Sequence, residues 1–301
     1  MSTRAIRIAI ALATASTIAL TPAASAIGPA PIALSRQGDL FTFRLGGAVH
    51  RLTETAAREN RPAWAPSRRR LAFVSGDRQV GVLRTRTGAT SSIAHLPTKF
   101  DEIQALAWSP DGGRIAIAAN NWFKWHGVWR LSGTAWTVGA DGGDLSMILA
   151  GQGMVTGLGW MPNGRKLLAS TEWPNGVELW DPDAPLGVIA FADDGSNLRL
   201  VSETLASQLD VSTDGRRATY RGWSRTCHAC GEIWRMATDG TGAHVIAMPP
   251  GGVNGLFMPR FSPAGTRIAV VASGRRSSLW VMHADGSGLH RVLTDIRSID
   301  W

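Results

Sequence analysis

The only two cysteines of the chain, Cys227 and Cys230, stand as a C-x-x-C pair, which can carry out redox chemistry, help to bind a metal or close a disulfide. Zinc would need two further ligands, and the sequence has no second Cys pair and no close pair of His residues. Haem attachment would need a His directly after the second Cys, where Gly231 stands. A redox C-x-x-C typically opens a helix, whereas this pair is expected in a loop between strands. We therefore predict a structural disulfide between Cys227 and Cys230, as is usual in exported proteins.

Aromatic residues are the second group that could form a site. The chain has thirteen Trp residues, and seven of them fill fixed positions of a sequence repeat that is described below. The other six are Trp122, Trp125, Trp129, Trp173, Trp180 and Trp223. They fall in three long insertions in neighbouring repeats, residues 120–133, 171–185 and 222–231, and exposed aromatic clusters often mark binding surfaces. Alternatively, these residues pack the insertions onto the body of the fold, since long loops need a core of their own.

From these insertions we select one set of candidate ligand-binding residues and no catalytic set. The candidate ligand-binding residues are Trp122, Phe123, Trp125, His126, Trp173 and Trp223. The sequence contains neither a G-x-S-x-G elbow nor an H-E-x-x-H helix. Asp181-Pro182-Asp183 and Asp193-Asp194-Gly195 lack the alternating oxygen ligands of a calcium loop, so no metal and no cofactor is predicted. A catalytic set assembled from distant segments is left open.

The elements that would position these residues follow from an internal repeat of about 46 residues. Its clearest copy is I-Q-A-L-A-W-S-P-D-G-G-R-I-A-I-A, residues 103–118, and its second half reads W-V-M-H-A-D-G-S-G-L-H-R-V-L-T at residues 280–294. Four β-prone segments are separated by Asp-Gly, Asn-Gly or Gly-Gly pairs, which supply the positive φ angles that tight hairpin turns need. Each unit is therefore predicted to be a four-stranded antiparallel sheet, with strands a to d, that stacks radially on its neighbours as one blade of a propeller.

The spacing of the copies and the two chain ends predict the number of blades. Strand a carries one anchor residue in each copy, at Trp64, Trp108, Trp160, Val211, Phe261 and Trp301. The chain begins with strands b, c and d and ends with a lone strand a, so one blade is built from both termini, which removes two open sheet edges. The prediction is an all-β, six-bladed β-propeller over residues 27–301. Its blades are expected at residues 296–301 with 31–54, then at 61–97, 103–150, 155–203, 206–250 and 256–294.

The first 26 residues read as a secretory signal peptide. Arg4 and Arg7 precede an apolar run over residues 8–20, and Ala24-Ser25-Ala26 forms a small-x-small cleavage site. An uncleaved membrane anchor is the alternative, but the run is shorter than the roughly 20 apolar residues that span a bilayer. We therefore expect cleavage after Ala26, a secreted or periplasmic protein and no membrane span.

The charge pattern argues against nucleic acid as a partner. The chain carries 31 Lys and Arg residues against 23 Asp and Glu residues, a formal net charge of +8. The arginines are scattered, whereas nucleic-acid binding favours a basic face with interleaved aromatic residues. An acidic polymer of the cell envelope is an alternative partner, and a monomer is expected.

The pattern W-S-P-D-G, I-A-x-A, W-x-x-x-x-D-G and L-T resembles the repeat of the TolB-like propeller family, over nearly the whole chain after residue 26. The related propeller domains of prolyl oligopeptidase-like peptidases share this pattern. The resemblance implies a binding platform for proteins, or a gate on a peptidase. TolB proper also has a separate N-terminal domain, for which this chain has no room, so no Tol-specific partner is inferred. Pro66-Ser67-Arg68 and Val211-Ser212-Thr213 depart from the pattern and weaken the expected regularity of blades 2 and 5.

The function predicted from these observations is that of an exported, non-enzymatic binding protein. It would recognise a protein or peptide through an aromatic rim on blades 3–5. A glycan ligand, an extracellular hydrolase or lyase with its site at the central channel, and a purely structural envelope component are the alternatives. Polar residues converging in the channel would favour an enzyme, and small or apolar residues there would favour binding.

Overall fold

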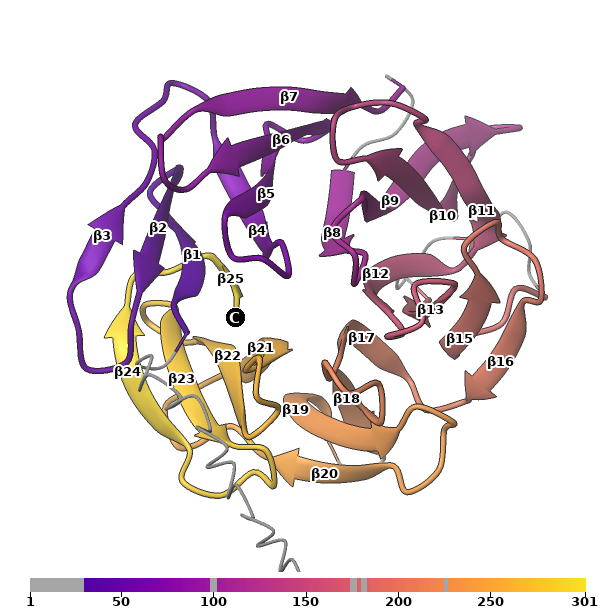
Figure 1. Ribbon diagram of the computed structural model, residues 1–301. Helices are drawn as coiled ribbons and strands as arrows, with labels where there is room; N and C mark the ends of the chain where they lie inside the picture. The colour runs from indigo at the N-terminus through magenta and orange to yellow at the C-terminus, as the bar shows by residue number, and fades with distance from the viewer. Residues whose placement is uncertain (1–29, 98–101, 174–177, 180–182, 225–226) are drawn as a thin grey trace, which may run out of the picture.

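The chain forms a ring of six antiparallel sheets around a central axis (Figure 1). The computed structural model describes residues 30–97, 102–173, 178–179, 183–224 and 227–301, without the side chains of residues 125, 178–179, 223–224 and 227–230. The predicted signal peptide and its cleavage site lie outside these residues. The described part of the chain contains strands and turns, and it has no helix that could cross a membrane.

Each sheet is a blade whose strand a lies nearest the axis and whose strand d lies outermost. Blade 1 consists of β25 (Ser298–Asp300), β1 (Ile32–Arg36), β2 (Asp39–Phe43) and β3 (Val49–Arg51). Blade 2 consists of β4 (Glu59–Trp64), β5 (Arg70–Ser75), β6 (Gln79–Arg84) and β7 (Thr90–His95). Blade 3 consists of β8 (Glu102–Trp108), β9 (Arg114–Trp125), β10 (Val128–Gly139) and β11 (Ser146–Gln152), with β14 (Glu178–Leu179) added beside β10.

The other three blades follow the same order. Blade 4 consists of β12 (Met154–Trp160), β13 (Lys166–Glu172), β15 (Gly187–Ala192) and β16 (Arg199–Ser202). Blade 5 consists of β17 (Ala206–Val211), β18 (Arg217–Ser224), β19 (Cys227–Ala237) and β20 (His244–Ala247). Blade 6 consists of β21 (Gly255–Phe261), β22 (Arg267–Ser273), β23 (Ser278–His283) and β24 (His290–Thr294). Blades 2 and 5 thus keep four strands despite their departures from the repeat.

Blade 1 closes the ring with strands from both ends of the chain, which confirms the predicted fold. The C-terminal strand β25 pairs antiparallel with β1, and Ala33, Leu34 and Ser35 lie opposite Asp300, Ile299 and Ser298. The Ser35 and Ser298 hydroxyl groups lie 2.7 Å apart in this buried ladder. Closure therefore rests on main-chain pairing between residues that are far apart in sequence.

The S-P-D-G turn of the repeat is held by hydrogen bonds within the turn itself. In blade 3 the Ser109 hydroxyl donates to Asp111 Oδ1 over 2.6 Å, and the Gly113 N–H donates to the same oxygen over 2.9 Å. These two bonds hold the pKa of Asp111 below its usual value. Blade 5 repeats the arrangement with Ser212 and Asp214. The Ser and Asp of the motif are thus explained by turn geometry.

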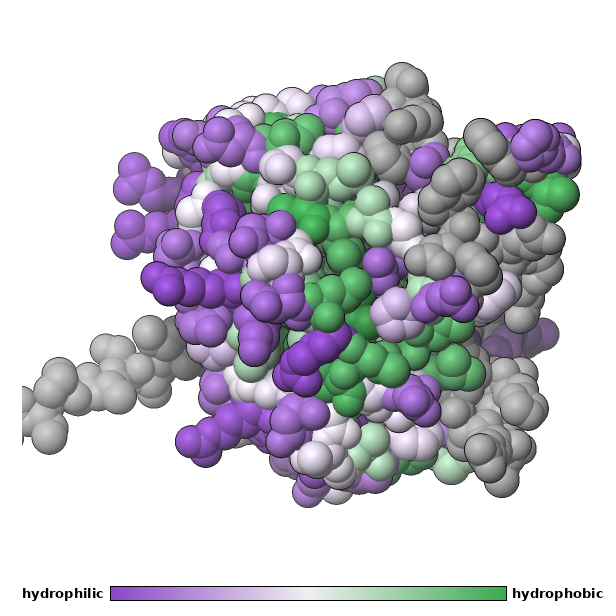
Figure 2. All heavy atoms as spheres, turned by 90° about the vertical axis from the view of Figure 1, so that its right-hand side faces the viewer, coloured by the Kyte–Doolittle hydropathy of each residue, from purple (hydrophilic) through white to green (hydrophobic). Residues whose placement is uncertain are grey.

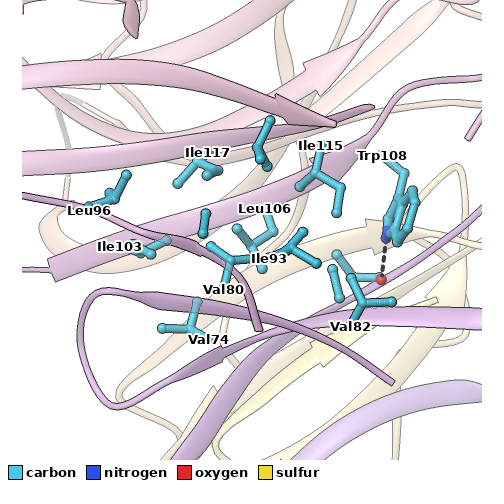
Figure 3. Close-up of a cluster of buried hydrophobic side chains, with 14 of the residues drawn as sticks. Val74, Val80, Val82, Ile93, Leu96, Ile103, Leu106, Trp108, Ile115 and Ile117 are labelled. Carbon is cyan, nitrogen blue, oxygen red and sulfur yellow. Dashed lines mark hydrogen bonds between the residues drawn. The ribbon is translucent and has the colours of Figure 1, made fainter. Parts of the chain in front are cut away.

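Neighbouring blades are joined by apolar side chains from their facing sheets. Figure 3 shows the cluster between blades 2 and 3, where Val80 and Val82 face Leu106 and Ile117. At its inner end the Trp108 indole N–H donates to the Ala63 carbonyl of the preceding blade over 2.9 Å. The anchor residues Trp64, Trp108, Trp160 and Trp301 are all buried. Their interpretation as core positions is therefore confirmed.

Several arginines join blades as well. The Arg114 guanidinium of blade 3 lies 4.9 Å from the centre of the Trp160 ring of blade 4 and donates to the Gly164 carbonyl over 3.1 Å. The same two contacts recur for Arg70 with Trp108 and Gly112, and for Arg217 with Phe261 and Gly265. An arginine in this position stacks on an aromatic face and binds a carbonyl at once. Part of the arginine excess is therefore structural.

Residues 120–133 and 222–231 are insertions between strands b and c, and the prediction that they form loops is wrong. In blade 3, β9 and β10 pair without interruption from Arg114 opposite Gly139 to Trp125 opposite Val128. His126 and Gly127 have φ angles of 49° and 83°, as a two-residue type I′ turn requires. In blade 5, pairing likewise extends to Ser224 opposite Cys227. In blade 3 the His126-Gly127 turn let the ladder grow beyond the length of the repeat.

Candidate functional site

The blade-3 hairpin, residues 120–133 at the ends of β9 and β10, carries the first part of the candidate site. Trp122 lies opposite Leu131, and the two pack on Ala184, Leu186 and Met154. Trp122 is therefore a packing residue that fixes the base of the hairpin to the insertion of blade 4. The parallel pairing of Leu131 with Leu179 of β14 adds main-chain bonds to the same contact.

The outer half of the blade-3 hairpin is exposed. Trp129 lies opposite Lys124, and the Lys124 ammonium group sits 5.1 Å from the centre of the Trp129 ring. Trp129 is 53% exposed and Val128 is 42% exposed. Trp129 was counted among the six unexplained Trp residues but was left out of the candidate site. Like the selected Trp residues, Trp129 occupies no repeat position, and this feature was enough to include it in the candidate site.

The other candidate residues are only partly brought together. Phe123 pairs with Arg130 and is partly buried, whereas His126 is exposed at the turn. Trp173, directly after β13, is 45% exposed. The side chains of Trp125 and Trp223 lie outside the described residues, and so do those of Cys227 and Cys230, so the predicted disulfide stays a prediction.

Glu172 adds a titratable group beside Trp173. Burial raises the pKa of Glu172 to about 7, and the charge of Arg221 on blade 5 opposes this rise. The Arg221 guanidinium lies 4.4 Å from the centre of the Phe257 ring of blade 6. The carboxyl group is thus held in a poorly hydrated place where three blades meet.

We expect the substitution Glu172→Gln to remove part of the pH dependence of stability. A carboxyl whose pKa is higher in the folded than in the unfolded chain binds its proton more tightly when folded. Its contribution is complete below its usual pKa of 4.5 and is lost as the pH rises through about 7. The free energy of unfolding of the unaltered protein should fall by up to about 3 kcal/mol more than that of E172Q across this window.

Urea titrations from pH 4.5 to 8 would measure this difference. Glu203→Gln, at an exposed position of the same blade, is the matched control and should follow the unaltered protein. Coinciding pH profiles for E172Q and the unaltered protein would contradict the assignment.

Large exposed apolar side chains gather on one side of the ring. Within the described residues they are Val128, Trp129, Leu145, Met147, Trp173, Leu198, Leu200, Leu205 and Met248. All except Met248 lie between residues 128 and 205, on blades 3 and 4 and the crossing into blade 5. Figure 2 looks at this side and shows hydrophobic residues forming a band down its middle. The blade-4 turn at Gly195 packs on the Ile148 carbonyl of β11, so the turn between β15 and β16 meets the outer strand of blade 3 here.

The central channel, which the sequence analysis gave as the place of an alternative enzymatic site without naming its residues, forms a second candidate site. A cavity of about 300 Å³ at the ends of the inner strands is lined by all six anchor residues and by the residue before each of them. Those preceding residues are Ala63, Ala107, Gly159, Asp210, Arg260 and Asp300. At these six positions the side chains are therefore small and apolar on blades 2–4 and charged on blades 5, 6 and 1. The small and apolar residues on blades 2–4 are what we expected of a binding protein, and the polar residues on blades 5, 6 and 1 are what we expected of an enzyme.

Both channel carboxylates also have a structural role. Asp210 accepts the Phe261 N–H over 2.8 Å, and Asp300 accepts the Trp64 N–H over 2.7 Å, so each ties its blade to the next. Burial raises the pKa of Asp210 to about 6, and Arg260 acts in the opposite direction. Burial raises the pKa of Asp300 as well. The Arg260 Nε lies 3.6 Å from Asp300 Oδ1.

Arg68 contributes a further charge to the channel mouth. Its φ angle of 58° places it in the left-handed region, where the corresponding turns have glycine at residues 112, 164, 215 and 265. A non-glycine residue there costs about 1–2 kcal/mol. The guanidinium lies 5.4 Å from the centre of the Trp64 ring, and Arg68 Nη1 and Trp64 Nε1 are buried without a hydrogen-bond partner in the described residues. The indole N–H groups of Trp108, Trp160 and Trp301 each bind a main-chain carbonyl group instead.

Comparisons with known proteins bear on the fold. No family model and no curated protein matches the chain. The structure of a putative TolB from Agrobacterium tumefaciens has 17% identity and a TM-score of 0.66, with 88% of this chain and 89% of that chain covered. TolB from Acinetobacter baumannii has 14% identity and a TM-score of 0.69, with 90% of this chain and 65% of that chain covered. An oligogalacturonate lyase from Vibrio parahaemolyticus has 12% identity and a TM-score of 0.59, with 85% of this chain and 71% of that chain covered. At such identities the likeness shows a TolB-like propeller fold and nothing more.

Proposed function

We propose, from the TolB-like propeller fold and the distribution of exposed apolar residues, that this is an exported binding protein for a protein or peptide. The partner would dock on the apolar surface of blades 3 and 4, formed by the blade-3 hairpin, Trp173 and the outer strands β11 and β16. The candidate residues Trp125 and Trp223 and the predicted signal peptide belong to this proposal. So does the expected secreted or periplasmic location.

The observation that carries the proposal is the one-sided placement of the exposed apolar side chains. Isolated exposed apolar residues are common on soluble proteins, but a contiguous group marks an interaction surface more often than chance. Trp129 is suited to the centre of such an interface, because Trp residues often dominate binding energy when a partner covers them. A glycan is the second kind of ligand, because a sugar ring stacks on an exposed indole such as that of Trp129.

A capture experiment with the mature chain, residues 27–301, tests this function. The bait would be compared with V128S/W129S, and Met248→Ser, an exposed apolar position outside the surface, would be the control. A captured partner would be purified and its dissociation constant measured for each form. We expect V128S/W129S to weaken binding at least about tenfold, the range for loss of one interface hot spot, with unchanged melting temperature. Equal affinity of V128S/W129S and M248S would contradict the proposed surface.

A second candidate function is a hydrolase or lyase acting at the central channel. The observation that favours it is the pair Asp210 and Asp300 beside Arg68 in one cavity, with the pKa of Asp210 raised toward neutrality. Asp210→Asn preserves the acceptor for the Phe261 N–H while removing the acid. Turnover of an oligosaccharide or peptide by the unaltered protein and its loss in D210N would support catalysis. Equal turnover would place the reaction elsewhere.

A further inference from the structure

Two cavities lie on the opposite side of the ring, one on each side of blade 6: the larger where blade 6 meets blade 1, and the smaller where blade 5 meets blade 6 (these blades are at the left and lower left in Figure 1). The larger one, of about 600 Å³, is lined by Arg36, Arg58 and Arg297. The smaller one, of about 420 Å³, is lined by Arg275, Arg276 and Arg291. The end of blade 6 separates them, since Ser277 and Asp295 border the first and their chain neighbours Ser278 and Thr294 border the second. We call the two cavities together the arginine groove.

The charge of the arginine groove is almost entirely of one sign. Asp295 is its only acidic lining residue, and it is shared by Arg36 at 3.9 Å and Arg276 at 3.4 Å. In the described part of the chain, the guanidinium groups of four other lining arginines have no hydrogen bond or ion pair. These are Arg58, Arg275, Arg291 and Arg297. Arg36 Nε is buried and lacks a hydrogen-bond partner there.

The fold does not explain these arginines. Those at positions 70, 114 and 217 join blades by stacking on a ring and binding a carbonyl. Arg58, Arg275, Arg291 and Arg297 instead are exposed around a hollow and bind no other blade. The like charges gathered in each cavity repel one another, so an anion that enters a cavity gains from the arginines that line it.

The other lining groups indicate which kind of anion fits. Gln37, Thr55, Ser277 and Thr294 offer hydrogen bonds suited to hydroxyl groups. Trp280 borders the second cavity, and its indole N–H is bound to the Ser278 hydroxyl over 2.9 Å, so the ring orientation is set. Both volumes lie within the range of small-ligand sites. Arginine pairs with a carboxylate in a bidentate geometry.

We propose that the arginine groove binds an acidic oligosaccharide, with its carboxylate groups on the arginines and a sugar residue against Trp280. This site is independent of the apolar surface of blades 3 and 4, which lies across the ring. A protein held on one side could thus be kept close to an acidic glycan held on the other.

Calorimetric titration of the mature chain with tetragalacturonate tests the proposal. The fully methyl-esterified tetramer has the same sugar backbone without the charges, and tripolyphosphate supplies charge without sugar. R58Q/R297Q and R275Q/R291Q each remove two charges from one cavity, and R165Q/R216Q removes two exposed charges elsewhere. We expect the tetramer to bind, each groove variant to weaken binding about tenfold, and R165Q/R216Q to bind as the unaltered protein does.

Three results would overturn the proposal. The first is no heat of binding with tetragalacturonate at 1 mM, a concentration that would detect affinities of about 4 kcal/mol. The second is that the methyl ester binds as tightly as tetragalacturonate. Binding of tripolyphosphate with the affinity of tetragalacturonate, and with the same loss of affinity in both groove variants, would count equally against the proposal. The third is an equal loss in R165Q/R216Q, which would indicate a general charge effect. Exposed positions make misfolding of these variants a small concern, and their melting curves would show it.

Discussion

Replacing Trp301 with alanine is expected to lower the free energy of unfolding by about 4 kcal/mol, within the range for loss of a buried Trp side chain. Trp301 is 6% exposed and packs with Ile32, Leu34 and Ile299. Its indole N–H donates to the Ala30 carbonyl over 2.9 Å, so the side chain joins the last residue of the chain to the first described one. The substitution therefore leaves a cavity at the point where the ring closes.

Trp129→Ala is the matched control, because it removes the same side chain from a position that is 53% exposed. We expect that variant to stay within about 0.5 kcal/mol of the unaltered protein, as surface substitutions usually do. Equilibrium unfolding in urea would measure both. Similar losses for the two variants would mean that the Trp129 side chain is part of the core and would remove it from the proposed docking surface.

The substitution Gly286→Ala is expected to cost about 3 kcal/mol. Gly286 lies in the turn between strands c and d of blade 6 with a φ angle of 92°, where an alanine is strained by about 1 kcal/mol or more. A Cβ atom there would also overlap the Ile246 carbonyl oxygen of β20 in blade 5. Because that oxygen belongs to a paired strand, relief would require the two blades to move apart, which adds an overpacking cost of about 1–3 kcal/mol.

Gly88→Ala separates these two contributions. Gly88 occupies the corresponding turn of blade 2 with a φ angle of 71°, but no atom lies within 4 Å of an added Cβ. This variant should show the backbone strain alone, a loss of about 1 kcal/mol. Denaturant titration of both variants would give the difference. Equal losses would show that the contact between turn and neighbouring strand does not constrain the spacing of the blades.

The fold could be predicted from the sequence because its determinants are local and repeated. Asp111 and Gly112 specify a turn by hydrogen bonds and φ angles within a few residues, and the copies of this turn mark where strands begin and end. The aromatic side chain at position 108 recurs at 64, 160 and 301, which reveals a buried position without any knowledge of what surrounds it.

The candidate site was harder to predict, since its residues are where the repeat is broken. The aromatic insertions pointed to blades 3–5, and exposed apolar residues do gather on blades 3 and 4. Trp122, however, proved to pack at the base of the hairpin, and Trp129 proved to be the exposed aromatic residue. Which of the two faces solvent depends on where the insertion of blade 4 lies against the hairpin, a contact between segments some fifty residues apart.

The sequence by itself determined the number of blades, the positions of their turns and the closure of the ring by residues 298–300 on β1, because these depend on strand period and turn chemistry. Only the tertiary structure decided which charges share a cavity. Radial stacking brings Arg68 of blade 2 beside Asp300 of blade 1, and it brings Arg297 and Arg36 around one hollow from opposite ends of the chain. Contacts between charged side chains of different blades depend on the angle between one blade and the next. No local pattern of residues in the sequence specifies that angle.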